Sequence, residues 1–375
     1  MKKVGIVGWR GMVGSVLINR MNEEEDFKYI NTSFFTTSQT GQKAPGIINA
    51  EPILLDAYSI EDLAKMDIII SCQGGDYTQK VYPLLKEIEW SGHWIDAAST
   101  LRMSDEAIII LDPINESKIK SSLKFGNKTW VGGNCTVSLM LLAIHGLIKE
   151  GAVEWVSSMT YQAASGAGAN NMRELLVQMG QLYGSAESEI NKPNFNILDI
   201  DYAVLDKMHS ADFTRDNFHV PLAGSLIPWI DQDLGNGISK EEWKGQSETN
   251  KILIGEYKSI RVDGLCTRIG SMRSHSQALT IKLKKNYEVD EINDLIKSSN
   301  QWVTLIPNDK ESSIHNLSPS AVSGTLNIAI GRIRKLALED NMISAFTVGD
   351  QLLWGAAEPL RRMLRILIDK DGSTF

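Results

Sequence analysis

The feature that most constrains the fold is an alternation of short apolar runs with helix-like segments over residues 1–130. Strand-like runs occur at residues 3–8, 33–37, 68–71, 93–96 and 107–110. Between the first two runs, apolar side chains recur at helical spacing at Val13, Val16, Leu17 and Met21. Continuous apolar runs such as Ile68-Ile69-Ile70 are typical of parallel strands covered on both faces. The alternation therefore predicts βαβ units and a doubly wound sheet.

Length and composition favour a two-domain globular protein and argue against a nucleic-acid-binding, secreted or membrane protein. A chain of 375 residues favours two domains, and 43% hydrophobic with 22% charged residues is typical of a soluble globular protein. The net charge of −8, without a Lys/Arg block, argues against nucleic acid as a partner. No signal-peptide core or membrane-length apolar stretch is present in the sequence. Cys72, Cys135 and Cys266 form no CxxC pair, so we expect a reducing, cytoplasmic location.

A glycine-containing turn lies between the first strand-like run and the first helix-like segment. It reads Gly8-Trp9-Arg10-Gly11-Met12-Val13-Gly14, with spacing G-x-x-G-x-x-G rather than G-x-G-x-x-G. Glycines here would let the backbone approach a pyrophosphate, and the helix N-terminus would supply N–H groups and a favourable dipole. Glycine turns are common, but this position after a strand favours nucleotide binding.

The residues at the end of the second strand indicate whether NAD or NADP would bind. NAD-preferring folds usually place Asp or Glu there, whereas this chain has Thr36-Thr37-Ser38-Gln39-Thr40. Hydroxyl groups and backbone amides can bind a 2′-phosphate, and Arg10 could add positive charge. The segment favours NADP over NAD, the alternative being an ordinary polar turn.

The segment Gly132-Gly133-Asn134-Cys135-Thr136 precedes the apolar run Val137 to Leu142. It predicts a short loop that delivers Cys135 to the first turn of a buried helix ending near Gly151. Free N–H groups and the helix dipole favour a thiolate there, so we expect a lowered thiol pKa and a nucleophilic cysteine. The alternative is an ordinary buried cysteine.

The pattern changes after Cys135. An alternating strand at 155–162 ends in Gln162, and a small-residue loop follows at 163–168. Residues 185–235 show little periodicity, so we expect long excursions, with an oligomer contact as one role. Ser239-Lys240-Glu241-Glu242 is a capping-box pattern and predicts a helix start. Arg268 and His275 would share one face if residues 266–274 were helical, and Leu279, Ile281 and Leu283 then alternate as in a strand.

Several charged side chains match one kind of ligand. A free amino acid with a phosphorylated side chain needs an anion for its ammonium group and cations for its carboxylate and phosphoryl groups. Glu241, Arg268, Arg102 and Lys244 could supply this set, with Cys135 as nucleophile and His275 as proton carrier. Taken singly, each residue could equally be an ordinary surface ion pair or a structural side chain.

Long ordered segments of the chain resemble the aspartate-β-semialdehyde dehydrogenase family in the form found in Gram-negative bacteria. The resemblance runs nearly end to end and rests on the segments GWRGMVGSVL, FFTTSQ, CQGGDYT, GGNCTVSLM, EEWKGQ, ETNKIL, RIGSMRSHSQA and VGDQLLWGAAEPLRRML. It implies that Cys135 forms the acyl-enzyme, that His275 is the acid/base residue and that Gln162 orients the acyl intermediate. It implies a phosphate site formed by Arg102, Asn134 and Lys244, and an amino-acid clamp of Glu241 and Arg268.

The resemblance also implies a cofactor site for NADP. The residues that fall where the family contacts NADP, together with the flanking turn glycines, are Gly8, Arg10, Gly11, Met12, Val13, Gly14, Thr37, Ser38, Gln73, Ser165, Gly166, Pro193 and Gln351. The implied reaction is the reversible, NADPH-dependent reductive dephosphorylation of L-aspartyl-β-phosphate to L-aspartate-β-semialdehyde. This reaction serves amino-acid biosynthesis on the branch to lysine, threonine and methionine.

The implied architecture is α/β. A Rossmann-type NADP-binding domain would use residues 1–133 with 354–375, and a mixed α/β domain at 134–353 would bind substrate and form a homodimer. The C-terminal helix should be amphipathic, with Leu360, Met363, Leu364 and Leu367 on one side, and Pro359 at a kink or in the first turn.

Three rival interpretations remain open. A cysteine hydrolase with a Cys135/His275 pair would leave the glycine turn without a purpose. A noncatalytic NADP-binding regulator would not need Asn134-Cys135 at a helix start. A reductase for N-acetylglutamyl phosphate would leave Glu241 without an ammonium group to bind. We expect no bound metal, because the histidines and carboxylates show no ligand spacing. Cys72, Cys266 and the histidines His93, His145, His209, His219 and His315 are expected to be structural.

Overall fold

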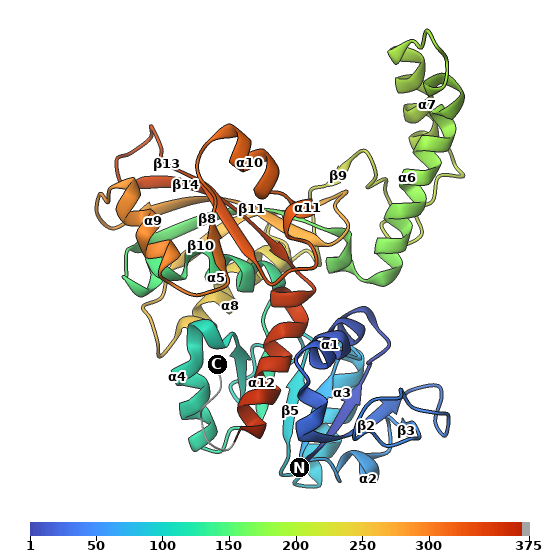
Figure 1. The fold of residues 1–375 in the computed structure, drawn as a ribbon, viewed down its shortest axis with the longest axis vertical. Helices are drawn as coiled ribbons and strands as arrows, with labels where there is room; N and C mark the ends of the chain where they lie inside the picture. Colours follow the sequence, from blue (N-terminus) through green and yellow to red (C-terminus); the bar gives the residue numbers. More distant parts are fainter. Residues whose placement is uncertain (370–375) are drawn as a thin grey trace.

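The computed structural model describes residues 1–369, which form two sheets of seven strands each. Figure 1 shows the first sheet with its helices in the lower part of the molecule and the second sheet above it. The predicted combination of a Rossmann-type parallel sheet with a mixed α/β part is confirmed. Within the described residues, no helix is long and apolar enough to cross a membrane.

The first sheet is parallel throughout, with strand order β3-β2-β1-β4-β5-β7-β6. Its strands are β1 Lys2–Val7, β2 Ile30–Thr36, β3 Leu55–Asp56, β4 Ile68–Ser71, β5 His93–Asp96, β6 Ala107–Ile110 and β7 Thr129–Gly132. The accompanying helices are α1 Met12–Glu23, η1 Asp26–Tyr29, α2 Ile60–Leu63, α3 Gly75–Glu87 and α4 Asp112–Lys124. The strands predicted from the apolar runs, and the helix between the first two, are confirmed.

The second sheet is mixed, with strand order β12-β13-β14-β11-β8-β10-β9. Its strands are β8 Val153–Gln162, β9 Leu226–Ile227, β10 Arg261–Ile269, β11 Ser274–Leu283, β12 Val303–Leu305, β13 Ile328–Lys335 and β14 Met342–Asp350. The remaining helices of this part are α5 Cys135–Lys149, η2 Ala164–Ala167, α6 Ala169–Ile190, α7 Ile197–His209, α8 Lys240–Leu253, α9 Val289–Lys297, α10 Lys310–Asn316 and α11 Pro319–Val322. β8 and β10 run parallel, and β11 is antiparallel to β8.

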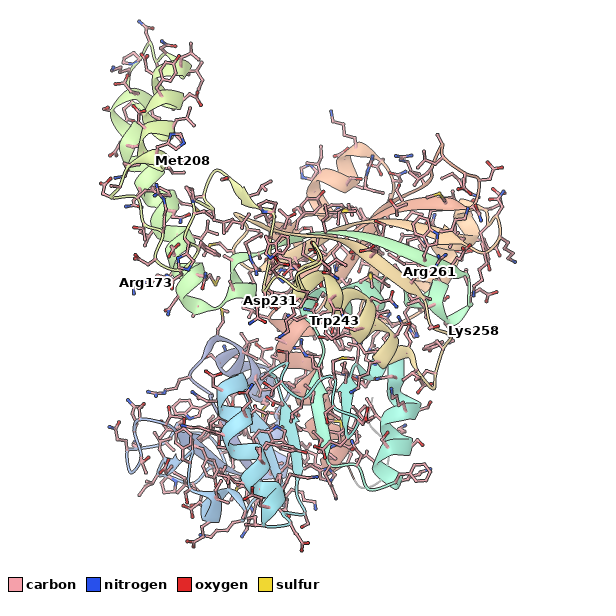
Figure 2. All side chains as sticks on the ribbon, turned by 180° about the vertical axis from the view of Figure 1, so that it is seen from behind. Arg173, Met208, Asp231, Trp243, Lys258 and Arg261 are labelled. Atoms are coloured by element: carbon pink, nitrogen blue, oxygen red, sulfur yellow. The ribbon has the colours of Figure 1, made fainter. Side chains whose placement is uncertain are left out.

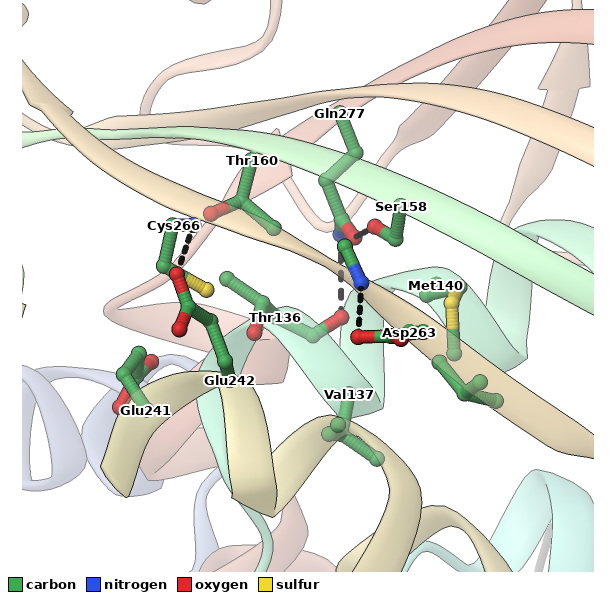
Figure 3. Close-up of a pocket in the computed structure, with 13 residues that line it drawn as sticks. Thr136, Val137, Met140, Ser158, Thr160, Glu241, Glu242, Asp263, Cys266 and Gln277 are labelled. Carbon is green, nitrogen blue, oxygen red and sulfur yellow. Dashed lines mark hydrogen bonds between the residues drawn. The ribbon is translucent and has the colours of Figure 1, made fainter. Parts of the chain in front are cut away.

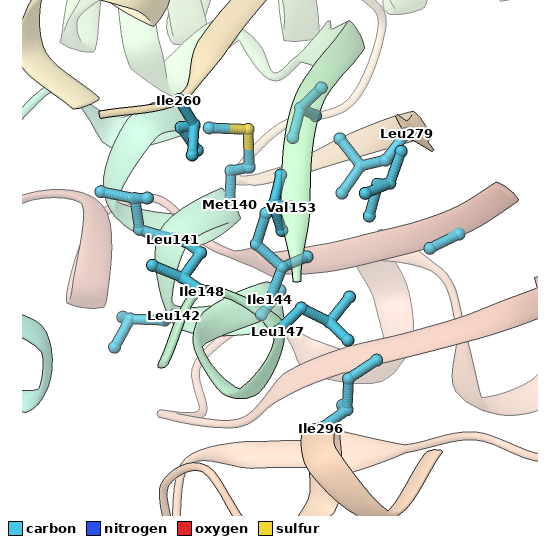
Figure 4. Close-up of a cluster of buried hydrophobic side chains, with 14 of the residues drawn as sticks. Met140, Leu141, Leu142, Ile144, Leu147, Ile148, Val153, Ile260, Leu279 and Ile296 are labelled. Atoms are coloured by element: carbon cyan, nitrogen blue, oxygen red, sulfur yellow. The ribbon is translucent and has the colours of Figure 1, made fainter. Parts of the chain in front are cut away.

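Helix α5 forms the centre of the second core. Its residues from Thr136 to Ile148 are buried, and Figure 4 shows them among side chains from β8, β11 and α9. A helix that is apolar on all sides is expected only in the interior of a protein. Glu150 ends the helix, and Gly151 follows with a left-handed φ of 69°, which matches the predicted glycine at this end. Because α5 is enclosed, the residue that begins it is held in a fixed position.

The C-terminal segment connects the two parts. A π-helical turn, η3 Leu353–Ala357, continues into α12 Glu358–Ile368, with Pro359 in the first turn. Leu360, Met363 and Leu364 are buried in the core of the first sheet and Leu367 packs against it, whereas Trp354 belongs to the core around α5. The amphipathic pattern is confirmed. The proposed domain division at these positions stays a prediction, and residues 370–375 lie outside the described residues.

Two expectations for the second part are wrong. Residues 185–235 do not consist of excursions alone, since α6 runs to Ile190 and α7 follows; the two helices form an arm that projects from the body (Figures 1 and 2). Residues 266–274 are not helical: β10 ends at Ile269, a loop follows, and β11 begins at Ser274. Arg268 and His275 thus lie on two strands that flank β8 instead of on one helix face.

Candidate active site

Cys135 occupies the predicted position at the start of a buried helix. β7 ends at Gly132, and Asn134 is the N-cap residue of α5; its Oδ1 accepts hydrogen bonds from the N–H groups of Thr136 and Val137 at 3.0 and 3.2 Å. Gly355 in η3 approaches from the other side: a Cβ atom at this position would lie 2.8 Å from the Cβ of Cys135. Cys135 is therefore held between the helix cap and a glycine that sequence reasoning did not identify.

His275 faces the sulfur. Its Nε2 lies 3.2 Å from Sγ of Cys135, and the N–H of Ala163 donates to Nδ1 at 3.0 Å. Burial, followed by the positive charge of Arg268, lowers the pKa of His275 to about 3. Because Nδ1 accepts a backbone hydrogen bond, the proton of the neutral ring is on Nε2, the nitrogen that faces the sulfur.

The prediction of a lowered thiol pKa is wrong. Cys135 is half-buried and lines a pocket, and the cost of desolvating the charged thiolate raises the pKa of the thiol to about 12. The Glu241 carboxylate acts in the same direction. Arg268, Arg102 and Lys244 act in the opposite direction without overcoming it. The sequence shows a helix start but not the loss of hydration, which decides this pKa.

Gln162, Arg268 and His275 come together because of strand register. Gln162 ends β8 and pairs with Arg268 in the neighbouring parallel strand β10, while β11 begins beside them on the other side. Arg268 donates from Nη1 to the carbonyl oxygen of Ala163 at 2.9 Å. Gly166 completes this corner, since a Cβ there would lie 2.7 Å from Nη1 of Arg268 and 3.1 Å from Nε2 of His275.

Glu241 is a buried carboxylate at the start of α8, whose predicted capping box with Ser239 and Glu242 is present. Its Oε1 accepts from Asn134 at 2.9 Å and from Gln162 at 3.1 Å, and its Oε2 from Lys244 at 3.0 Å. Burial would raise the pKa of Glu241, but Lys244 and these hydrogen bonds lower it below its usual range. Glu241 and Lys244 are both buried, so this pair is not a solvated ion pair, and Lys244 also contacts Asp231 at 2.6 Å.

Arg102 enters from the first part of the chain, in the loop after β5. Its Nε donates to the carbonyl oxygen of Gly132 at 2.7 Å, and its Nη1 contacts Oε1 of Glu248 at 3.1 Å. Sequence reasoning missed Glu248 and Asp231. The spacing could have indicated Glu248, because it lies seven residues after Glu241 on the same helix.

A pocket of about 710 Å³ lies between the two parts of the chain and holds most of the predicted site. Predicted residues that line it are Gly11, Met12, Val13, Arg102, Asn134, Cys135, Gln162, Ser165, Gly166, Glu241, Lys244, Arg268 and Gln351. Gln351 donates to Oγ of Ser165 at 2.8 Å. His275 contributes through its contact with Cys135.

A second cavity of about 340 Å³ adjoins the first at Gly11 and Cys72. Gly8, Arg10, Gly11, Thr37 and Gln73 line it together with Trp9, Phe35, Thr36 and Cys72. Ser38 accepts a hydrogen bond from Arg10 at 3.1 Å, and Gly14 lies beneath the turn, where a Cβ would be 2.2 Å from the carbonyl oxygen of Gly8. Cys72 was expected to be only structural, but its place directly after β4 brings it to both cavities.

Gly14 and Ser38 lie next to residues that line these cavities, whereas Pro193, another predicted cofactor residue, lies far from them. It follows α6, whose span from Ala169 to Ile190 is about 32 Å at 1.5 Å per residue. Ala169 lines the pocket, so Pro193 lies at the far end of the arm.

A small cavity of about 20 Å³ lies between the first turn of α5, the start of α8 and the second sheet (Figure 3). Gln277 donates to the carbonyl oxygen of Thr136 at 3.0 Å and accepts from Ser158 at 3.0 Å. Glu242 accepts from the N–H of Cys266 at 3.2 Å. The contact of Gln277 with Thr136 fastens the first turn of α5 to the sheet, and the contact of Glu242 with Cys266 fastens the start of α8 to it. Among residues 1–369, no group of three His, Cys, Asp or Glu side chains is placed to hold a metal ion.

Known proteins are similar to this chain over nearly its whole length. Residues 3–122 match the NAD-binding domain of semialdehyde dehydrogenases, and residues 144–354 match the dimerisation domain of semialdehyde dehydrogenases. The structure of aspartate semialdehyde dehydrogenase from Francisella tularensis is 50% identical, with 98% of this chain and 100% of that chain covered and a TM-score of 0.93.

Two more distant structures share the fold. Aspartate semialdehyde dehydrogenase II from Vibrio cholerae, complexed with ASA, is 21% identical, with 99% of each chain covered and a TM-score of 0.79. The enzyme from Candida albicans with NADP is 14% identical, with 98% of each chain covered and a TM-score of 0.64.

Proposed function

Because this chain belongs to the aspartate semialdehyde dehydrogenase family, we propose that its pocket reduces L-aspartyl-β-phosphate to L-aspartate-β-semialdehyde through a thioester on Cys135. The observation that carries the proposal is the 3.2 Å contact between Sγ of Cys135 and His275 in a pocket that also holds Glu241, Arg268, Arg102 and Lys244. An anion and several cations around one nucleophile suit an amino acid with an acyl phosphate side chain.

The substrate would itself activate the thiol. Glu241 is, after burial, the main cause of the raised thiol pKa. A substrate ammonium group placed beside Glu241 cancels this negative charge, so the pKa of Cys135 falls when substrate binds. Arg268 would bind the α-carboxylate, and Arg102 and Lys244 the phosphoryl group.

The thiol, its pKa lowered by the bound substrate, releases its proton to solvent, and the resulting thiolate attacks the acyl carbon. The bond to the phosphate oxygen breaks, and phosphate leaves with the electron pair. The Nε2–H of His275 stabilises the thiolate before attack. As the tetrahedral intermediate forms, it donates to the carbonyl oxygen, where negative charge develops, which lowers the barrier. Gln162, fixed by Glu241 and by Oγ1 of Thr160 at 3.2 Å, orients the thioester. After reduction, collapse of the tetrahedral oxyanion releases the aldehyde and restores the thiolate.

The residues around the glycine turn fit a nicotinamide dinucleotide. A Cβ at Gly8 would lie 2.5 Å from the backbone of Cys72, so only glycine allows this close turn, and α1 begins with no side-chain cap at Gly11. Its first N–H groups are therefore available to a pyrophosphate. When bound, the reduced nicotinamide supplies the hydride that reduces the thioester.

Preference for NADP over NAD is part of the proposal. Arg10 donates from Nη1 to Gln39 at 2.5 Å and from Nη2 to Ser38 at 3.1 Å, which places a cation beside the end of β2. Neither of the predicted strand-end residues Thr37 and Ser38 is acidic, so neither side chain repels a 2′-phosphate.

We further propose that the chain acts as a homodimer in the cytoplasm. α7 has no buried residue among those described, and apolar side chains of the arm such as Leu176, Tyr183 and Phe195 are exposed. Met159, Tyr161 and Leu265 are exposed on β8 and β10. A second copy could cover these surfaces, and its arm could bring Pro193 to the cofactor. Sedimentation of wild type and of Tyr183→Glu tests this assembly.

The reaction is tested by following reduced-nicotinamide absorbance with protein, aspartate semialdehyde, phosphate and NADP. Parallel assays contain NAD, or N-acetylglutamyl semialdehyde, or no phosphate. We expect phosphate-dependent reduction of NADP with aspartate semialdehyde alone. Reduction without phosphate, or with the acetylated substrate only, would refute the proposal.

A further inference from the structure

Glu248 is a buried carboxylate that touches two parts of the site without lining the pocket. Its Oε1 lies 3.1 Å from Nη1 of Arg102, and its Oε2 accepts a 2.7 Å hydrogen bond from the N–H of Asn134, the residue before the nucleophile. Its side chain is 2% exposed. A carboxylate buried this deeply is stable only when both oxygens have strong partners.

The position follows from the periodicity of α8. Glu241, Lys244 and Glu248 are spaced by three and four residues and therefore lie on one face of the helix. Glu241 binds the side chain of Asn134, whereas Glu248 binds its backbone. One turn further on, Lys251 donates to the carbonyl oxygen of Ser104 at 2.6 Å, in the loop that carries Arg102. This face of α8 thus holds both the start of α5 and the Arg102 loop.

The contacts of Arg102 leave one nitrogen for a ligand. Nε is bound by Gly132 and Nη1 by Glu248, while Nη2 has no hydrogen-bond partner among residues 1–369. A guanidinium group that is bound at two of its nitrogens has a fixed plane and direction. Its third nitrogen, Nη2, can therefore bind a ligand with little further loss of side-chain entropy.

We propose that Glu248 is a positioning residue for the phosphate step: it sets the direction of Arg102 relative to Cys135. This inference rests on the proposed role of Arg102 as a phosphate ligand. The Glu248 carboxylate binds both Arg102 and Asn134, the cap residue of α5, so it fixes the position of Arg102 relative to Cys135. The phosphorus–oxygen group and the sulfur must lie at a fixed separation during acyl transfer, and misplacement by about 1 Å can cost roughly 10²-fold in rate.

The chemistry of the side chain allows an isosteric test. Glutamine has one acceptor oxygen, so Glu248→Gln can accept from Arg102 or from Asn134 but not from both. Loss of the negative charge would, by itself, strengthen phosphate binding to Arg102. A fall in kcat/KM for phosphate therefore reports lost positioning and not lost charge.

The experiment measures kcat/KM for phosphate in the oxidative direction at saturating NADP and aspartate semialdehyde. For Glu248→Gln we expect a fall of about tenfold or more, with kcat/KM for NADP at saturating phosphate within about twofold of wild type. Glu248→Asp, which keeps both oxygens on a shorter stem, should recover part of the loss. The matched control is Glu256→Gln. Glu256 follows the end of α8 and accepts a hydrogen bond from the N–H of Lys118 on α4 at 2.5 Å, and it does not line the pocket.

A double-mutant cycle with Arg102→Gln distinguishes failure of the Glu248 inference from failure of the proposed phosphate role of Arg102. If Glu248 acts through Arg102, Glu248→Gln should change kcat/KM for phosphate by less than about twofold in the Arg102→Gln background. An unchanged or increased value for Glu248→Gln alone, or equal losses in both backgrounds, would overturn the inference while leaving the phosphate role of Arg102 intact. If Arg102→Gln has no effect on kcat/KM for phosphate, the proposed phosphate site and this inference both fail.

Discussion

Gly355→Ala should slow turnover strongly although no reacting group is changed. A Cβ at residue 355 would lie 2.8 Å from the Cβ of Cys135, 3.2 Å from its Cα and 3.3 Å from the Cβ of Gln351. None of these atoms is the end of a flexible side chain, so relief requires a shift of several tenths of an ångström in η3 or in the first turn of α5. Overpacking of this kind costs about 1–3 kcal/mol of stability.

The shift falls on Cys135, the proposed nucleophile. Misplacement by about 1 Å can cost roughly 10²-fold in rate, so we expect kcat to fall by about 10- to 100-fold. The control is Gly46→Ala, an exposed position where an added Cβ meets no atom within 4 Å. Urea unfolding and steady-state turnover would be measured for both variants. Full kcat in Gly355→Ala, with stability equal to wild type, would refute the close packing of η3 against Cys135.

Other substitutions and a pH series test the remaining electrostatic claims. Glu241→Gln removes a negative charge that raises the pKa of the Cys135 thiol, so iodoacetamide should alkylate Cys135 faster than in wild type. The same substitution should raise KM for aspartate semialdehyde by about tenfold or more, because a charge-assisted contact with the substrate is lost. Slower alkylation than in wild type would contradict the effect assigned to the Glu241 charge. The rate at which iodoacetamide alkylates Cys135 in the free protein should increase about tenfold per pH unit from neutral pH upward. With a thiol pKa of about 12, the reactive thiolate is a minor species over this range. A rate that levels off near neutral pH would contradict this. Arg10→Gln should raise KM for NADP by roughly tenfold and leave that for NAD unchanged, since Arg10 is proposed to meet only the 2′-phosphate; equal changes for both cofactors would exclude that role.

Local signals in the sequence predicted the elements that position the site. The apolar runs identified the first sheet, Gly132 to Thr136 gave the loop before α5, and Ser239 with Glu242 gave the start of α8. Each of these features is encoded within a few neighbouring residues. Strand identity and capping therefore follow from sequence without knowledge of the tertiary fold.

Features that depend on distant partners were not predicted. The thiol pKa depends on how completely other segments exclude water from Cys135, which the helix start does not reveal. Arg268 and His275 meet through the register of β10 and β11 with β8, and seven-residue spacing suggested a helix instead. α7 buries none of its described residues within this chain, so the usual apolar stripe against a core gave no guide to the arm.

Trapping the covalent intermediate tests the central claim most directly. Protein would be mixed with aspartate semialdehyde and NADP without phosphate, quenched in acid and analysed by intact-mass and peptide mass spectrometry. The account predicts an aspartyl thioester on Cys135 that disappears on addition of phosphate, and neither adduct nor turnover in Cys135→Ala. An adduct on another residue, or substantial phosphate-dependent turnover in Cys135→Ala, would contradict it.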